Sequence, residues 1–311
     1  ATDWQGLHNV EENILLLNPE NGWLQNCNST PYTAALQYSP KPEDYPVYMS
    51  KDQENFRGVH AISLLSEINK IDLDGLITLA HDPFLPAFEA LIPGLVKAFD
   101  QWGSSVGEMN AAIEILRQWD FKTSEDSVAM TLAHFYGTRY GQKGVRPFAM
   151  SDMELMTYFG SGSPEKERLA IFEETLQQLN TDFGTWNTPW GSVNRYQRLN
   201  GDPRQAFNDS LPSTPIGFAS GRWGALAAYG ARYFNNTKKI YGTRGNSFVA
   251  VVSFGEKLQA KSILAGGQSG DLNSPHFGDQ LSRYAEANFK EVLFYKEAVL
   301  KDAQRSYRPG E

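Results

Sequence analysis

A short polar segment near the start of the chain carries side chains that could do chemistry. It reads Asn26-Cys27-Asn28-Ser29-Thr30-Pro31. The segment follows a run that we expect to be a β-strand, and a carboxamide N–H at a strand end can point into a cleft and stabilise a developing oxyanion. The alternative is an Asn-rich turn whose side chains bind their own backbone, and the segment alone favours that turn.

No self-contained catalytic signature accompanies this segment. The sequence has no G-x-S-x-G elbow, no phosphate-binding glycine loop and no pair of histidines at helical metal-ligand spacing. Ser274, His276 and Asp279 lie close together in the sequence. Adjacency within a loop is not the geometry of a hydrolase triad, so we do not assign one.

Two strands are predicted to position the polar segment. They cover residues 14–17 and 23–28, and the turn residues Asn18, Pro19, Asn21 and Gly22 separate them. Pro31 should end the second strand because proline lacks a backbone donor.

A helical region should follow. Apolar residues recur at helical spacing from Phe56 to about residue 179, which predicts several consecutive helices. Asp72 and Ser163 are predicted N-caps. Breaks or kinks are expected at Pro83, Pro86 and Pro93.

The last third of the chain reads as strands again. Residues 247–254 and 258–264 predict a hairpin with a tight turn, and a helical stretch at 279–289, a closing strand at 292–295 and a terminal helix follow. We therefore predict an α+β fold in three parts. Residues 1–55 hold core strands, 56–180 a helical region, and 181–311 returning strands with the C-terminal helix.

Composition excludes several functions. The net charge of −8 argues against a nucleic-acid surface, which needs clustered Lys and Arg. No apolar run approaches the roughly 20 residues that span a bilayer. The single cysteine, Cys27, excludes an internal disulfide and a multi-thiolate metal site. The 13% aromatic content fits large core side chains better than a sugar-stacking surface.

Four ordered blocks of sequence carry a resemblance to a known family. They are Asn18-Pro19 with Gly22 to Pro31, then Trp119-Asp120, then Trp186 to Arg195, and finally Gly267-Gln268-Ser269-Gly270 with Ser274-Pro275-His276 and Asp279-Gln280. In this order they resemble the penicillin acylase (penicillin amidase) family of N-terminal-nucleophile hydrolases. The third block resembles the subgroup of aculeacin A and acyl-homoserine-lactone acylases. The blocks run through nearly the whole chain.

The resemblance implies that this sequence corresponds to the C-terminal part of the family's β chain. The fold would be part of an αββα sandwich with a central helical insertion. The activity would be cleavage of N-acyl amides such as β-lactams, acyl-homoserine lactones or acylated peptides. The family's nucleophile is a Ser or Cys freed as a new chain N-terminus, and its own α-amino group accepts its proton. Ala1 cannot be that residue, so we expect this chain to be a fragment that is inactive alone.

Carried over residue by residue, the resemblance places the family's oxyanion-hole asparagine on Asn28. The active-site arginine aligns best with Arg57, although the gap before it differs from that of penicillin G enzymes. No cofactor is implied for the chemistry. The family's structural calcium borrows an aspartate from this region, but neither Asp44 nor Asp52 aligns cleanly, so the resemblance leaves room for a structural calcium in the full-length protein and assigns no ligand to it.

The resemblance also implies partners and a location. The substrate would be a small N-acyl amide, and upstream α and β segments of the same precursor would complete the fold. Sheets that lack those strands would have exposed edges, so self-association of the fragment is expected. Family members point to a periplasmic or secreted protein, with no membrane span and no nucleic-acid partner.

Two readings compete with the acylase. One is a noncatalytic carbohydrate- or ligand-binding module, suggested by the aromatic content. The other is a glycosidase, which needs two carboxylates about 5–10 Å apart, and nothing in the sequence selects such a pair. Only the acylase requires the side chains of Asn28 and Arg57 to lie close together.

Overall fold

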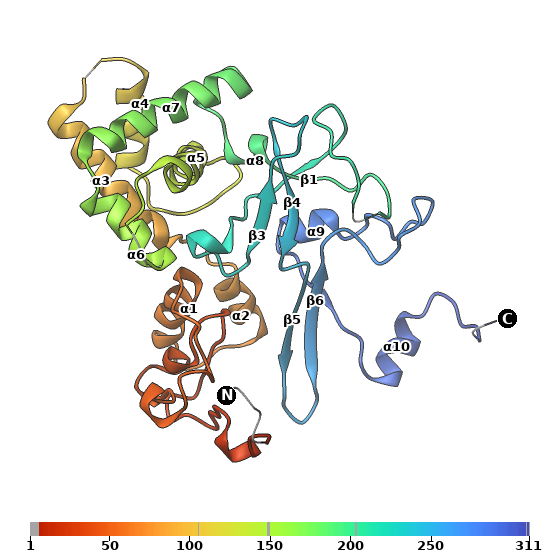
Figure 1. The fold of residues 1–311 in the computed structure, drawn as a ribbon. Helices are drawn as coiled ribbons and strands as arrows, with labels where there is room; N and C mark the ends of the chain where they lie inside the picture. Colours follow the sequence, from red (N-terminus) through yellow and green to blue (C-terminus); the bar gives the residue numbers. More distant parts are fainter. Residues whose placement is uncertain (1–5, 105, 148–149, 203, 309, 311) are drawn as a thin grey trace.

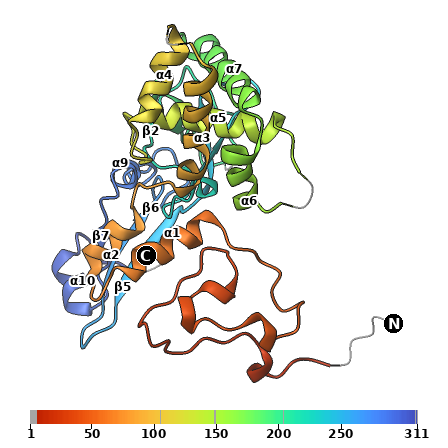
Figure 2. The same cartoon turned by 90° about the vertical axis from the view of Figure 1, so that its left-hand side faces the viewer.

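The computed structural model describes residues 6–104, 106–147, 150–202, 204–308 and 310. It has the predicted α+β composition, with a group of helices from the middle of the chain and two small sheets from the last third (Figure 1). Helix α1 (Phe56–Ser66) lies between the helical group and the N-terminal segment, which forms open loops (Figure 2).

The N-terminal segment contains no strand among its described residues. It has four short 3-10 helices, η1 (Val10–Glu12), η2 (Pro31–Thr33), η3 (Leu36–Tyr38) and η4 (Pro42–Asp44). The strands predicted at 14–17 and 23–28 are therefore wrong. A strand needs a neighbour to take its backbone hydrogen bonds. Here the Gln25 N–H donates to Ala34 O of the same segment, and positive φ angles at Asn18 (47°) and Gly22 (77°) bend the chain.

The predicted helical region is confirmed. After α1 it comprises α2 (Leu73–Ala80), α3 (Pro86–Trp102), α4 (Glu108–Arg117), α5 (Val128–Lys143), α6 (Asp152–Thr157), the π-helical turn η5 (Tyr158–Gly162) and α7 (Glu165–Phe183). Asp72 caps α2 as expected, because its Oδ1 accepts from the Gly75 N–H at 2.7 Å. The helical run is interrupted between α2 and α3, where Pro83 lies, and Pro86 is the first residue of α3.

Pro93 lies inside α3 and does not break it, because buried side chains on both sides of it, including Leu91 and Leu95, hold the helix against the core. One detail of the helical prediction is wrong. Ser163 does not cap α7, which begins at Glu165. The Ser163 hydroxyl instead donates to Phe159 O, the carbonyl that also accepts from the buried Arg168.

The main core joins the helices to the last third of the chain. Trp223 ends the turn η6 (Gly221–Trp223) and stacks on Phe88 of α3 with ring centroids 4.7 Å apart. Its indole N–H donates to His134 Nδ1 of α5 at 3.1 Å. Burial lowers the pKa of His134 to about 3, so the ring is a neutral acceptor at pH 7. These aromatic side chains pack in the hydrophobic core, as expected.

The last third forms two small sheets. One has the order β2-β1-β4-β3, from β1 (Asn194–Tyr196), β2 (Thr214–Pro215), β3 (Tyr229–Arg232) and β4 (Ile240–Gly245); the other has the order β5-β6-β7, from β5 (Phe248–Ser253), β6 (Gln259–Leu264) and β7 (Lys290–Glu291). Among the described strands, β1 and β4 are the pair that runs parallel. The short helices are α8 (Trp190–Val193), α9 (Leu281–Ala285) and α10 (Lys296–Asp302).

The β5–β6 hairpin is confirmed, with Phe248 opposite Leu264 and Ser253 opposite Gln259. The closing strand is shorter and earlier than predicted. It is β7, which pairs with β6 only through its two residues, so residues 292–295 are not a strand. Strand β5 is the outer strand of its sheet, and Phe248 on it is 65% exposed.

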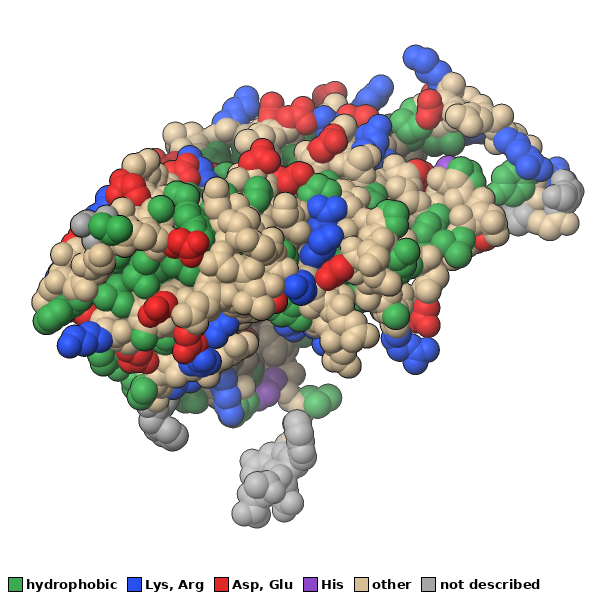
Figure 3. Space-filling view, turned by 90° about the horizontal axis from the view of Figure 1, so that it is seen from above, with side chains coloured by type: hydrophobic (Ala, Val, Ile, Leu, Met, Phe, Trp, Pro, Cys, Tyr) green, Lys and Arg blue, Asp and Glu red, His purple; other side chains and the backbone are tan. Residues whose placement is uncertain are grey.

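The surface carries both charge signs. On the face that Figure 3 shows, acidic and basic side chains are interspersed among hydrophobic ones. Within the described residues, no helix is both long enough and apolar enough to cross a membrane.

Close backbone contact between α3 and η5 requires glycine. A Cβ on Gly160 would lie 2.0 Å from the carbonyl oxygen of Ala90, which is backbone and cannot swing aside. We predict that Gly160→Ala forces the two elements apart and lowers the free energy of unfolding by about 1–3 kcal/mol. Urea unfolding measures this loss. Gly270→Ala is the matched control because its Cβ meets nothing within 4 Å, and equal effects of the two changes would contradict the prediction.

Candidate active site

The Asn-rich segment forms a tight turn whose two asparagines do different things. The Asn26 Oδ1 accepts from the backbone N–H of Asn28 at 2.8 Å. For Asn26, the prediction of a turn whose side chain binds its own backbone is therefore correct. Asn28 itself has φ 54°, the left-handed conformation that asparagine tolerates better than most residues. Its side chain does not bind its own turn and is exposed.

Arg57 contacts the turn through one guanidinium nitrogen. Its Nη2 donates to Cys27 O at 2.7 Å and to Asn28 Oδ1 at 2.8 Å. Because a guanidinium only donates, the carboxamide oxygen must face it and the amide nitrogen must face away. No described residue accepts a hydrogen bond from Asn28 Nδ2. The structure thus brings the two predicted site residues together, while their catalytic roles stay predictions.

The start of α1 places Arg57. Asn55 is the N-cap, and its Oδ1 accepts from the Gly58 N–H at 3.1 Å. The aliphatic part of Arg57 then passes Gly221 of η6, where a Cβ would lie 2.8 Å from Arg57 Cδ. The lack of a side chain at Gly221 therefore makes room for Arg57.

A buried histidine ties the same helix to the turn η6. His60 is 3% exposed, and its Nδ1 donates to the carbonyl oxygen of Gly224 at 2.8 Å. Its Nε2 lies 3.1 Å from the Asp82 carboxylate. Gly224 has φ 102°, a conformation that other residues rarely adopt. Helix α1 is thus fixed one turn away from Arg57.

A carboxylate and a thiol lie close to the turn. Glu54 accepts from the Asn55 N–H at 2.8 Å and from the Thr33 hydroxyl. Burial raises the pKa of the Cys27 thiol, and the nearby Arg57 charge opposes that shift. The thiol is therefore protonated at neutral pH and is a poor nucleophile.

Sequence reasoning missed Asn55 and Glu54. Asn55 lies directly before the first apolar residue of a predicted helix, which is the position of an N-cap, so its capping role could have been predicted from the sequence. Its contact with the turn 28 residues earlier in the chain could not have been predicted, because no local pattern indicates it.

The tail block of the sequence folds elsewhere. Arg198 donates to three of its backbone carbonyls, Gly267 O at 3.0 Å, Phe277 O at 2.6 Å and Ser269 O at 2.8 Å. These bonds hold the block as a structural loop. The His276 Nδ1 lies 2.8 Å from Asp279, while the Ser274 hydroxyl oxygen accepts only from the His276 backbone N–H among the described hydrogen bonds. This arrangement is no catalytic triad.

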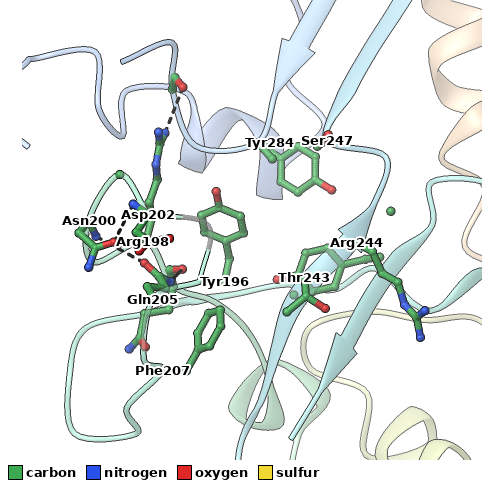
Figure 4. Close-up of a pocket in the computed structure, with 17 residues that line it drawn as sticks. Tyr196, Arg198, Asn200, Asp202, Gln205, Phe207, Thr243, Arg244, Ser247 and Tyr284 are labelled. Carbon is green, nitrogen blue, oxygen red and sulfur yellow. Dashed lines mark hydrogen bonds between the residues drawn. The ribbon is translucent and has the colours of Figure 1, made fainter. Parts of the chain in front are cut away.

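A pocket of about 390 Å³ lies beside that block (Figure 4). Tyr196, Arg198 and Phe207 come from one side, and Tyr284 and Thr243 come from the other. Neither Asn28 nor Arg57 lines it. The pocket is therefore separate from the Asn28 turn.

The described residues do not form a calcium site by themselves. Calcium takes six to eight oxygen ligands, and the described part of the chain has no group of three His, Cys, Asp or Glu side chains that could hold a metal ion. Asp44 and Asp52, the two aspartates of the connection, are both exposed. A structural calcium in the full-length protein stays a prediction.

The fold is α+β, and the site presents an oriented amide donor on a turn. Comparison with known proteins identifies the class. A penicillin amidase family model matches residues 1–301, so the chain belongs to the penicillin amidase family. The family predicted from the sequence blocks is confirmed.

A solved structure shares the fold. It is a thermostable penicillin G acylase from Alcaligenes faecalis in orthorhombic form, with a TM-score of 0.50 and 15% sequence identity. The match covers 94% of this chain and 57% of that chain. The chain thus spans little more than half the length of the acylase that it resembles.

Arg57 should hold the turn closed over Cys27. We predict that Arg57→Lys, which keeps the charge but loses the guanidinium geometry, speeds modification of Cys27 by a thiol reagent about 10-fold. Losing a charged hydrogen bond costs about 1.5–3 kcal/mol, and each 1.4 kcal/mol is a factor of ten in local opening. Arg139→Lys, in the α5–α7 contact with Glu174, is the control and should leave the rate unchanged. An unchanged rate in Arg57→Lys would show that the contact does not hold the turn.

Proposed function

We propose that the complete protein containing this chain is an amide hydrolase that acts on N-acyl amides through an N-terminal Ser or Cys. We place that nucleophile outside these 311 residues. The observation that carries the proposal is the Arg57–Asn28 contact, which turns the amide N–H groups of Asn28 away from the guanidinium and leaves them without an acceptor among the described residues. A binding module or a glycosidase does not require that contact.

In this mechanism the α-amino group of the nucleophilic residue accepts the proton of its own side chain. That group has an ordinary pKa of about 7.7–8.0, so no histidine is needed. The Ser or Cys side chain attacks the amide carbonyl, and the carbonyl oxygen becomes an oxyanion. Asn28 Nδ2 donates to this oxyanion. The amine then leaves with the transferred proton, and water hydrolyses the acyl-enzyme to a carboxylic acid.

Arg57 contributes through orientation. It binds Asn28 Oδ1 before the reaction begins, so the amide donor does not have to reorient when negative charge develops on the substrate oxygen. Its positive charge also polarises the carboxamide and strengthens the N–H groups as donors. Arg57 is a positioning residue in this scheme, and Asn28 is the catalytic one.

The substrate class follows from the block around Trp186 to Arg195. Its likeness to the aculeacin A and acyl-homoserine-lactone acylases favours an aliphatic acyl chain. Aromatic acyl groups are the alternative, and β-lactams, lactones and acylated peptides all supply suitable amines. We place the protein in the periplasm or outside the cell, as its resemblance implies.

The outer strand β5 supports a requirement for further segments of the precursor. Phe248 on this strand is 65% exposed, Phe254 directly after it is 85% exposed, and Leu17 in the N-terminal segment is 75% exposed. Exposed apolar edges attract further strands. We propose that upstream segments of the complete protein cover them, and that the isolated chain self-associates instead.

A ligand-binding module is the second candidate. The aromatic walls of the pocket in Figure 4, with Tyr196, Phe207 and Tyr284, are the feature that favours it. A glycan array discriminates between the two functions. Saturable binding of a sugar without amide hydrolysis by the complete protein would favour the module.

Removing the Asn28 donor should impair catalysis. In the complete protein, Asn28→Ala is expected to lower kcat about 10²–10³-fold with little change in KM, because the donor acts on the transition state. Asn28→Asp is the matched variant: it keeps the size and the acceptor for Arg57 but removes the N–H, and it should be equally slow. Steady-state kinetics with a chromogenic acyl amide measure both, and near-wild-type turnover in either would reject the assignment.

The isolated 311-residue chain should hydrolyse no amide, because the proposed nucleophile lies outside it. The assay is release of a chromogenic amine by the purified chain across a range of protein concentrations. Sustained hydrolysis in proportion to the concentration of the chain would place a nucleophile within these residues.

A further inference from the structure

Asn55 binds two parts of the structure at once. Its Oδ1 caps α1 by accepting from the Gly58 N–H. Its Nδ2 donates to the backbone carbonyls of Cys27 at 3.1 Å and Asn28 at 3.3 Å. One side chain therefore joins the helix that carries Arg57 to the turn that carries Asn28.

The bonded carbonyls are the ones that set the direction of the Asn28 side chain. Cys27 O accepts from both Asn55 Nδ2 and Arg57 Nη2, and Asn28 O accepts from Asn55. These contacts flank the φ of 54° at Asn28, a conformation that persists only when its surroundings hold it. Asn26 adds one bond from the other side, to the Asn28 N–H.

We propose that Asn55 is a positioning residue that holds Asn28 in its left-handed conformation and so aims its amide donor. This inference rests on the proposed function for its catalytic consequence. The geometric part is independent of activity, because it concerns the conformation of Asn28 alone. The contact needs a side chain with both an acceptor and a donor at one end, and asparagine has that arrangement.

The competing explanation is that Asn55 is only a helix cap. Substitution separates the two roles because Ser and Asp cap helices about as well as Asn but have no amide donor. Asn55→Ser and Asn55→Asp therefore keep the cap and lose the contact with the turn. Asn55→Ala loses both. Asp72→Ala, at the cap of α2, loses a cap without touching the turn and is the matched control.

The experiment measures kcat, KM and the thermal midpoint of the complete protein for these four variants. We expect Asn55→Ser and Asn55→Asp to lower kcat about 10–100-fold with KM within about threefold, because small displacements of a catalytic group cost up to about 10² in rate. Their thermal midpoints should stay near that of the wild type. Asp72→Ala should have a lower midpoint and an unchanged kcat.

Wild-type kcat in Asn55→Ser and Asn55→Asp would overturn the inference. So would a loss of kcat that follows the thermal midpoint equally in all four variants, since that pattern is the one expected of a cap alone. If the wild-type protein hydrolyses no acyl amide, the proposed function fails, and a crystal structure of Asn55→Ser then decides the geometric part. Asn28 leaving the left-handed region supports the inference, and Asn28 unchanged in conformation rejects it.

Discussion

The candidate site depends on the fact that a guanidinium group can donate hydrogen bonds but cannot accept them. Arg57 binds the carboxamide oxygen of Asn28, so the amide nitrogen faces away from the guanidinium. An asparagine beside a hydroxyl, which both donates and accepts, could flip with little loss. Here the flip would set N–H against N–H next to a positive charge. The direction of the donor is thus built in before any substrate arrives.

The position of Arg57 in turn depends on a core that joins distant parts of the chain. Trp223 inserts between helices from the middle of the sequence, and the turn that it ends lies against α1. The His60–Gly224 hydrogen bond and the missing side chain at Gly221 fit that turn closely to the helix. The segments that meet at the site are therefore separated by up to about two hundred residues in sequence. Changes in the aromatic core should reach Asn28 through this contact.

The most recognisable sequence block does not lie at the candidate site. The tail around Gly267 and Gln280 forms a loop that Arg198 holds through backbone carbonyls. Glycine is required at position 267 because the loop folds closely on itself there: a Cβ at Gly267 would lie 2.2 Å from His276 O. A specific motif can thus identify a family through a structural constraint, while the proposed chemistry lies in a plainer segment.

The sequence by itself determined the α+β class, the run of helices from α1 to α7, the β5–β6 hairpin and the family, because hydrophobic periodicity and turn residues are local signals. It also selected Asn28 and Arg57, through resemblance. It could not show that residues 23–28 do not form a strand, because strand formation depends on a hydrogen-bonding neighbour that no local pattern reveals. Only the tertiary structure decided that Asn28 faces Arg57 rather than its own turn, and that Asn55 joins the two segments. These two contacts join residues 29 and 28 positions apart, and their geometry is set by how α1 packs rather than by the residues on either side.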